Sequence, residues 1–378
     1  MDFDTTDLQR QFRDTLQRYV AKEYSFDARR RIAQSEAGCS REHWQAFADL
    51  GLLALTLPEA HGGLGGDAFD TMVAMEALAS ALVLEPHLVT AVICGGLIDD
   101  AGSDAQKAAL LPAVAAGELV LAFAHFEAGT RWDRSHVATA ARAEAAGFVL
   151  DGAKTVVHAG AEADRLLVSA RTAGAVRDDA GISLFVVDRA AAGVEVRGYP
   201  TQDGTRAAEI ALTGVRVGTG AQLGEPGGAL PAIERAIDRG IAALCGEAVG
   251  LMAALNAATL EYLKTREQFG GPIGRFQALQ HRMVDMFIAA EEARSMAILA
   301  GVGVRAADPA ERRRAVSMAK ARIGQCARLV GQQAIQLHGG MGVTDDLVVS
   351  HWFKRLTAID LMFGDADHHL ARVSDQMA

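Results

Sequence analysis

The 378-residue sequence is poor in cysteine and aromatic residues and has no surplus of positive charge. Its four cysteines show no CxxC or Cys/His ligand spacing, so we expect buried thiols in a reducing compartment, with no disulfide and no zinc. Its 37 Lys and Arg stand against 47 Asp and Glu, which argues against a nucleic-acid-binding or anionic-membrane-binding surface. Small-molecule chemistry or protein partners suit such a chain better.

Long apolar runs are also missing. No stretch reaches the roughly 18 apolar residues of a membrane span. The apolar stretches around Leu82 and Val114 are interrupted by proline and charged residues, which indicates buried helices. The segment MDFDTTDLQRQF is acidic and polar, without the apolar core of a secretory signal. These features predict a soluble, cytoplasmic protein without membrane association.

The common motifs of nucleotide and hydrolase chemistry are absent. There is no GxxxxGK[ST] phosphate loop, no GxSxG elbow, and no GxGxxG opening a helix after a strand. His368 and His369 beside Asp365 and Asp367 could suggest a metal site. Adjacent side chains on a helix diverge, however, and no second ligand cluster is evident, so we predict no metal.

The apolar pattern changes twice along the chain. Apolar residues at three- and four-residue steps predict an N-terminal helical domain over 1–117, with helices at 7–31, 41–53, 69–84 and 106–115. Short β-branched or alternating runs predict a middle β-domain over 118–222, a barrel or sandwich. A helical bundle follows over 229–378, with a stripe from Ile237 to Tyr262 and helices at 278–304, 310–337 and 347–363.

The predicted fold is therefore α+β, mainly α. The C-terminal helices are long and apolar over more than one face, which a domain of this size cannot cover alone. A bundle buried in an oligomer follows from this pattern.

Two glycine-bearing segments stand out: YLKTREQFGGPIGRFQ over 262–277 and QLHGGMGVT over 336–344. Each ends a long helix with a basic or amide side chain followed by bare backbone, which lets main-chain N–H groups approach an anion such as a pyrophosphate. Arg266 adds a planar, permanently charged fork. Either segment alone is equally explained as an ordinary glycine C-cap, but the ordered pair is more specific.

With the loop LPEAHGGLGG and the helix, strand, helix order, these segments resemble the acyl-CoA dehydrogenase family over nearly the whole chain. The resemblance implies a tetramer with FAD at subunit interfaces, where the two segments embrace the adenosine diphosphate half of an FAD held mainly by the neighbouring subunit. The FAD contacts that it implies in trans are Arg266, Phe269, Gln277, Gln336, Gly339 and Gly340.

The resemblance also implies α,β-dehydrogenation of an acyl-CoA thioester, in which a carboxylate takes the α proton and flavin N5 accepts the β hydride. This chain lacks that carboxylate at both of the family's positions. One is occupied by Phe363 or Gly364, depending on a one-residue shift in alignment, and the other by Gly240. Asp365 is the nearest replacement. Other candidates are Asp367, Asp238 and Glu247, although a solvated or capping role is more usual for each, so we assign no catalytic base.

The β-domain departs from the family as well. The motif Thr-Glu-Pro-x-x-Gly-Ser-Asp is replaced by 126–133, FEAGTRWD, so that Phe126 stands at the flavin-facing threonine. The segment Lys-x-Trp-Ile-Thr becomes 154–158, KTVVH, without the aromatic residue that packs on the isoalloxazine. Ile241 stands where an arginine is expected to meet CoA. The chain's own flavin and CoA pocket is degraded, whereas the segments that serve a neighbour are intact.

This asymmetry predicts the base-lacking partner in an α2β2 enzyme, similar to the small subunits of heteromeric pimeloyl-CoA or steroid side-chain dehydrogenases. The implied partners are a homologous large subunit, a bulky or dicarboxylic acyl-CoA, and an electron-transfer flavoprotein. Two alternatives remain. One is an autonomous homotetrameric dehydrogenase with a displaced carboxylate base, and the other is a non-catalytic acyl-CoA-binding or flavin-binding protein.

Overall fold

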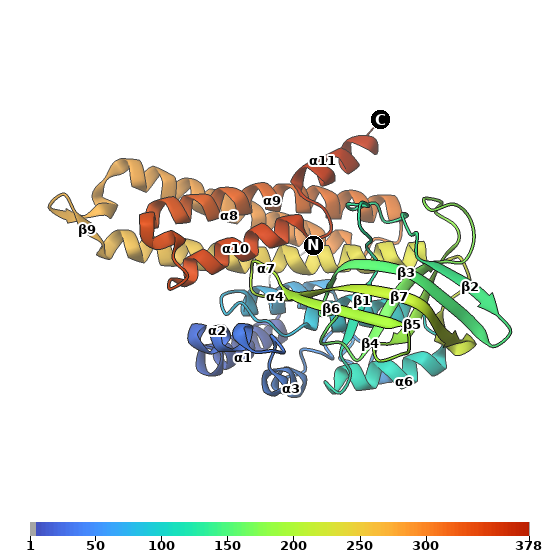
Figure 1. Ribbon diagram of the computed structural model, residues 1–378. Coiled ribbons are helices and arrows are strands. Elements are labelled where there is room, and N and C mark those ends of the chain that lie inside the picture. The colour runs from blue at the N-terminus through green and yellow to red at the C-terminus, as the bar shows by residue number, and fades with distance from the viewer. Residues whose placement is uncertain (1–4, 378) are drawn as a thin grey trace. The chain divides into compact units, whose positions relative to one another are not determined.

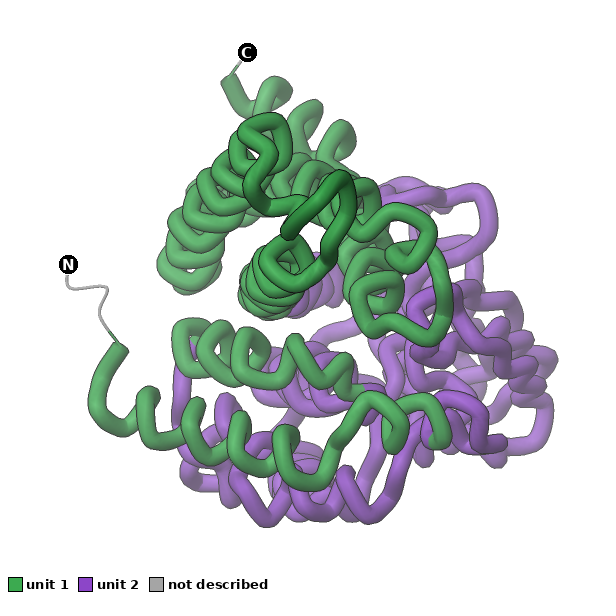
Figure 2. Tube along the Cα trace, turned by 90° about the vertical axis from the view of Figure 1, so that its left-hand side faces the viewer, with its two compact units in different colours: residues 1–31, 68–83, 241–378 green, residues 32–67, 84–240 purple. Residues whose placement is uncertain are grey.

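The computed structural model describes residues 5–377, so Met1–Asp4 of the polar N-terminal segment and Ala378 lie outside the described residues. The chain divides into two compact units (Figure 2). Unit 1 comprises residues 1–31, 68–83 and 241–378, and unit 2 comprises residues 32–67 and 84–240. Each unit is therefore built from segments that are distant in the sequence.

The N-terminal helices largely follow the predicted pattern. They are α1 Asp7–Glu23, α2 Phe26–Gln34, α3 Arg41–Asp49, α4 Ala68–Ala79 and α6 Asp104–Ala115. The prediction of one helix over 7–31 was wrong, because the chain breaks at Tyr24 and Ser25. The Ser25 hydroxyl accepts a hydrogen bond from the Ala28 amide at 3.2 Å and so satisfies a free N–H at the start of α2.

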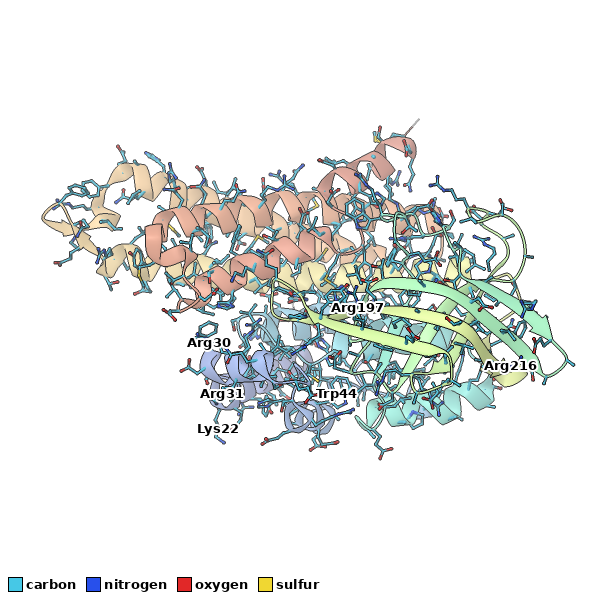
Figure 3. The ribbon with its side chains drawn as sticks, viewed as in Figure 1. Lys22, Arg30, Arg31, Trp44, Arg197 and Arg216 are labelled. Atoms are coloured by element: carbon cyan, nitrogen blue, oxygen red, sulfur yellow. The ribbon has the colours of Figure 1, made fainter. Side chains whose placement is uncertain are left out.

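Unit 2 contains two helical segments that the apolar pattern did not predict. They are the π-helix η2 Leu88–Gly95, which is buried throughout, and α5 Gly96–Ala101. The Thr90 hydroxyl donates to the Leu121 carbonyl at 2.8 Å, which ties η2 to the first strand. In the same unit, Trp44 of α3 donates its indole N–H to the Gly117 carbonyl at 2.8 Å (Figure 3). These bonds satisfy polar groups that burial would otherwise leave unpaired.

The predicted β-domain forms a single mixed sheet in unit 2. Its strands are β1 Leu121–Ala124, β2 Ala140–Glu144, β3 Gly147–His158, β4 Arg165–Arg171, β5 Ile182–Asp188, β6 Val194–Pro200, β7 Arg206–Gly218 and β8 Gln222–Leu223. The order is β6-β7-β3-β2-β4-β5-β8, and β1 pairs in parallel with β4. Apolar side chains of these strands fill a buried core that includes Leu150, Leu166 and Phe185. The β3–β7 ladder shifts register between Lys154 and Val157.

The long C-terminal helices run side by side as a bundle (Figure 1). They are α7 Leu230–Thr265, α8 Gln277–Gly303, α9 Pro309–His338 and α10 Val348–Leu361, followed by the unpredicted α11 Ala366–Asp375. Within unit 1, α8 is tied to α4 by Arg294 and Glu76, whose closest charged atoms are 2.9 Å apart. The Trp352 indole of α10 donates to the Ser80 carbonyl just beyond α4 at 2.9 Å.

Among the described residues, α7 alone is long and apolar enough to span a membrane by length and composition. However, 67% of its most apolar 18-residue window is buried within the protein. Burial of this kind is the normal property of a core helix.

Candidate functional site

The two glycine segments lie at the same end of the unit 1 bundle, where the β9–β10 hairpin projects at the left of Figure 1. Tyr262 at the end of α7 stacks on His338 at the end of α9, with ring centroids 4.5 Å apart. Arg282 of α8 donates to the Gln333 side chain of α9 at 3.0 Å. Both contacts join the helix ends that carry the two segments. The folded chain therefore places these helix ends together, although they are distant in the sequence.

The first segment forms a short hairpin between α7 and α8. Arg266 follows the last residue of α7 and is exposed, and the strands β9 Glu267–Gln268 and β10 Gly271–Pro272 come next. The Phe269 side chain at the hairpin tip is 84% exposed, and Gln277 is the exposed first residue of α8. A cation, a ring and an amide thus remain available to a ligand from outside the chain.

The second segment follows α9 directly. Gln336 is exposed on the last turn of the helix, and Gly339 has φ +61°, a left-handed conformation that favours glycine. A Cβ placed on Gly339 or on Gly340 would meet no atom within 4 Å, so open space lies beside both backbones. His338 before them is buried, and burial lowers the pKa of its imidazole. Bare exposed backbone at the end of α9 suits the pyrophosphate of a dinucleotide such as FAD.

The β-domain positions that face the flavin in the family are occupied differently. Phe126 meets the His125 ring edge to face, with centroids 5.0 Å apart, and Phe123 stacks on the same ring with centroids 5.3 Å apart. Val156, at the family's aromatic position, has φ +50° and is 48% exposed within the register shift of β3. Neither Phe126 nor Val156 offers the hydroxyl or the indole that the family places against a flavin. This part of the chain therefore does not fit the isoalloxazine half of FAD.

Behind Phe126 lies a buried polar network that the sequence pattern did not reveal. The Lys154 ammonium donates to Glu127 Oε1 at 2.7 Å and to Ser169 Oγ at 3.1 Å. Thr139 donates to the same Glu127 oxygen through its hydroxyl at 2.7 Å. His125 completes the network through Nδ1 and Ser169 Oγ, which are 2.9 Å apart. Lys154 within the strand β3 was the sequence signal for it.

The network is charged at neutral pH. Burial lowers the pKa of Lys154 to about 8 against the attraction of Glu127. Burial would raise the pKa of Glu127, but the Lys154 charge and the hydrogen bonds from Lys154 and Thr139 outweigh it and lower that pKa to about 2. Burial lowers the pKa of His125 to about 3, so its imidazole is neutral. An ionised pair braced by neighbouring hydrogen bonds fixes the backbone beside Phe126.

No carboxylate stands at either position predicted for the family's base. Gly240 is buried on α7, and its neighbour Ile241 is fully buried. Gly364 has φ +120°, and a Cβ there would lie 2.5 Å from His368 Cδ2 and 2.7 Å from His369 Nε2. Such distances are too short for real contacts, so the turn admits only glycine at 364.

The turn that carries Phe363 and Gly364 is held from two sides. The Lys320 ammonium of α9, which is 1% exposed, donates to the carbonyls of Asp360 and Gly364, both at 2.8 Å. His369 of α11 is fully buried, with Nδ1 3.1 Å from Ser317 Oγ and Nε2 3.2 Å from the Phe363 carbonyl. Because the His369 ring is buried and bonded at both nitrogens, it cannot move aside to make room for a Cβ at position 364.

Three of the four candidate replacement carboxylates have structural partners. Asp365 caps α11 by accepting from the His368 amide at 2.8 Å. Asp238 forms a buried pair with Arg134 at 2.8 Å. Glu247 of α7 accepts both Nε, at 2.6 Å, and Nη2, at 2.8 Å, from Arg355 of α10. Asp367 is exposed in the first turn of α11. The three paired or capping carboxylates therefore already have structural roles in the fold.

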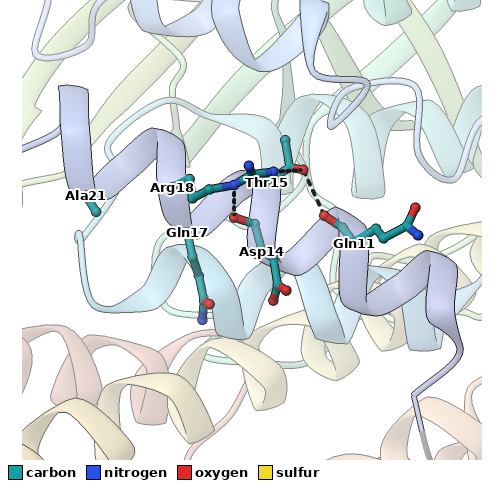
Figure 4. A pocket seen from close by; sticks show the side chains of 6 residues that line it. All are labelled: Gln11, Asp14, Thr15, Gln17, Arg18 and Ala21. Carbon is teal, nitrogen blue, oxygen red and sulfur yellow. Dashed lines mark hydrogen bonds between the residues drawn. The ribbon is translucent and has the colours of Figure 1, made fainter.

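A metal cluster and a surface hollow were the remaining candidates for a functional site. Within residues 5–377, no three His, Cys, Asp or Glu side chains gather closely enough to hold a metal ion. A shallow hollow is lined by α1 residues alone: Gln11, Asp14, Thr15, Gln17, Arg18 and Ala21 (Figure 4). Arg18 there donates to the Asp14 carbonyl and to the Thr15 hydroxyl, both at 3.2 Å. The hollow contains none of the residues predicted from the sequence.

Comparison with known proteins gives matches along almost the whole chain. Models of the acyl-CoA dehydrogenase N-terminal, middle and C-terminal domains match residues 6–118, 122–215 and 228–378. The short-chain specific acyl-CoA dehydrogenase of Clostridium acetobutylicum is 26% identical over 336 residues, 86% of each chain.

Two solved structures extend the comparison. A chain of the Tcur3481–Tcur3483 steroid ACAD, in a variant form, is 28% identical, with a TM-score of 0.88 over 98% of each chain. A chain of the ChsE4–ChsE5 complex from Mycobacterium tuberculosis is 24% identical, with a TM-score of 0.88 over 100% of this chain and 99% of that one. At that identity the second match speaks for the fold alone.

Proposed function

This chain belongs to the acyl-CoA dehydrogenase family of oxidoreductases acting on CH–CH bonds, and on that premise we propose that it is the base-lacking subunit of a heteromeric acyl-CoA dehydrogenase. The observation that carries the proposal is the turn at Phe363 and Gly364. Lys320 and His369 hold it closed, and no carboxylate fits at 364. A homologous large subunit then has to supply the base.

The cofactor of the proposed complex is FAD, shared between the two kinds of subunit. Exposed Arg266, Phe269 and Gln277, with Gln336, Gly339 and Gly340 of the second segment, support contact with the adenosine diphosphate half of a partner's FAD. The isoalloxazine half belongs to the large subunit in this proposal, because Phe126 and Val156 offer it no hydrogen bond in this chain. Bound FAD supplies the hydride-accepting chemistry.

The proposed reaction is dehydrogenation of an acyl-CoA thioester between its α and β carbons. In this proposal the large subunit's carboxylate would take the α proton, and bound FAD would supply the chemistry that accepts the β hydride. Electrons then leave through an electron-transfer flavoprotein. A bulky, steroid-type or dicarboxylic acyl group is the proposed substrate class, supported by the likeness to a steroid ACAD. A cytoplasmic location stays a prediction from the sequence.

The two alternatives have less support. An autonomous homotetramer needs a displaced base, yet Asp365, Asp238 and Glu247 have the structural partners described above. A non-catalytic acyl-CoA-binding or flavin-binding protein would use the same exposed contact groups at the bundle end, so this alternative is distinguished by the activity of the complex. The closed turn counts against autonomy.

The visible spectrum of the purified chain tests the proposal, alone and together with a homologous large subunit that carries the glutamate. We expect a lone chain without substrate-bleachable flavin, and a complex whose yellow colour bleaches when acyl-CoA is added. Arg266→Ala should lower the FAD retained by the complex, since it removes a fixed charge. A yellow lone chain that bleaches with acyl-CoA would contradict the shared site and favour autonomy.

A further inference from the structure

The tip of the β9–β10 hairpin has an unusual sequence for its conformation. Gln268 pairs with Gly271, which leaves Phe269 and Gly270 as a two-residue turn. Both residues have positive φ, +54° and +85°. Turns of this kind favour Asn followed by Gly, because a bulky side chain is strained at positive φ. Phenylalanine at the first position is therefore a poor choice for folding the hairpin.

Burial does not explain the phenylalanine either. The Phe269 side chain is 84% exposed, so most of its apolar surface remains in water. It meets the Phe276 ring edge to face, with centroids 6.0 Å apart, and Phe276 is itself 36% exposed. A strained backbone that presents an exposed ring suggests a ligand from outside the chain.

Arg275 forms hydrogen bonds with the backbone of this turn. Its Nη2 donates to the Phe269 carbonyl and its Nη1 to the Gly270 carbonyl, the latter at 3.3 Å. The guanidinium carbon lies 5.2 Å from the centroid of the Phe276 ring. A Cβ on Gly271 would come within 3.0 Å of Nη1, so the guanidinium sits directly against the hairpin backbone. The Arg275 side chain thus contacts both carbonyls of the turn and the Phe276 ring.

We propose that Arg275 is a positioning residue that keeps Phe269 at positive φ, so that its exposed ring stacks on the planar base of a dinucleotide held by a partner subunit. The inference rests on the proposed function, which places this hairpin against a partner's FAD. Aromatic side chains stack on nucleobases through their flat faces. Such stacking is most effective when the ring is fixed before the ligand arrives.

Phe269→Asn separates folding from binding. Asparagine suits the turn better, so the lone chain should gain about 1–2 °C in Tm. The complex of this variant with the large subunit should retain about tenfold less FAD after gel filtration, because the stacking ring is gone. A purely structural residue would move both readouts in the same direction. Full FAD retention by Phe269→Asn would overturn the stacking role.

Arg275→Gln and the double variant test the positioning role. Arg275→Gln should speed amide hydrogen exchange at Gly270 and Gly271 in the lone chain by about tenfold. It should lower the FAD retained by the complex, but add little to the loss already caused by Phe269→Asn. Arg275→Lys should restore part of the retention, because lysine can reach one carbonyl. Lys22→Gln, which breaks an exposed pair with Glu23 on α1 outside both glycine segments, is the control and should change neither readout.

The outcomes distinguish this inference from the proposed function. Unchanged amide exchange in Arg275→Gln, or FAD losses that simply add in the double variant, would overturn the positioning role and leave the shared FAD site standing. A large subunit that retains its full FAD without this chain would overturn the shared site itself.

Discussion

Unit 1 carries two glycine turns with opposite surroundings. At the bundle end, a Cβ added to Gly339 or Gly340 would meet no atom within 4 Å, and the Phe269 ring at the hairpin tip of the same end is 84% exposed. At the C-terminal turn, Gly364 is enclosed by the rings of His368 and His369, and its carbonyl accepts from buried Lys320. The first glycines leave room for a ligand, whereas the second removes a side chain so that the chain can close on itself.

The two turns differ in which predicted feature of the family they keep. The open turn keeps the predicted FAD contacts, and the closed turn lacks the predicted base. The open turns leave backbone available for the nucleotide that, in the proposed complex, another subunit holds. The closed turn carries Phe363 and Gly364, one of which stands at the predicted position of the family's base, and its packing supports the proposed loss of the carboxylate. Restoring a glutamate at 364 would require His369 to leave its bonds with Ser317 and Phe363.

The largest expected effect comes from Gly364→Ala. The new methyl group meets the buried His369 ring and is placed at φ +120°, so we expect a loss of about 4 kcal/mol in the free energy of unfolding. Urea denaturation of the lone chain measures it. Gly340→Ala is the matched control, since open space surrounds it, and should change stability by less than about 0.5 kcal/mol. Equal stability of the two variants would contradict the contrast between the turns.

Lys320→Met is expected to have the next largest effect on the free energy of unfolding. It leaves the carbonyls of Asp360 and Gly364 buried without their donor, and we expect a loss of about 2 kcal/mol at pH 7. Exposed Lys264→Met, with its side chain 58% accessible, should cost less than about 0.5 kcal/mol in the same urea titration. An undiminished stability of Lys320→Met would show that the turn closes without the lysine.

Lys320 also gives the closed turn a pH dependence. Burial lowers its pKa from 10.5 to about 8 in the folded chain. Between about pH 8 and pH 10.5 the unfolded chain therefore binds the proton that the folded chain has released, so this residue's contribution to stability rises with pH. The stability difference between wild type and Lys320→Met should widen over this window. A constant difference would mean that the amine titrates normally.

Periodicity predicted the general fold well because each region's apolar spacing persists over many residues. The three-domain fold, mainly helical with a middle sheet, was confirmed. Local breaks were harder to predict: Tyr24 and Ser25 interrupt a continuous apolar pattern, and only the Ser25 cap reveals the start of a second helix. The short α11 was missed because its start depends on the Asp365 cap. The boundaries 1–117, 118–222 and 229–378 stay predictions.

The candidate site was also predicted only in part from the sequence. The sequence marked both glycine segments, because glycine after a helix is visible in a single chain. It could not reveal that Tyr262 and His338 bring them together, since that contact depends on the packing of α7 and α9. The roles of Arg275, Lys320 and His369 were also hidden, because each acts on the backbone of another turn. The FAD contacts themselves stay a proposal.

The smallest expected effect concerns Asp365, the remaining rival as a base beside the closed turn. Its carboxylate accepts from the His368 amide at the start of α11, and asparagine caps helices about as well as aspartate. Asp365→Asn should therefore change the free energy of unfolding by only a few tenths of a kcal/mol, whereas Asp365→Ala should cost about 1 kcal/mol. Turnover of acyl-CoA by the complex should be unchanged in Asp365→Asn, because its amide loses nothing but the ability to accept a proton. Lost turnover with an intact melting curve would identify Asp365 as a base and return catalysis to this subunit.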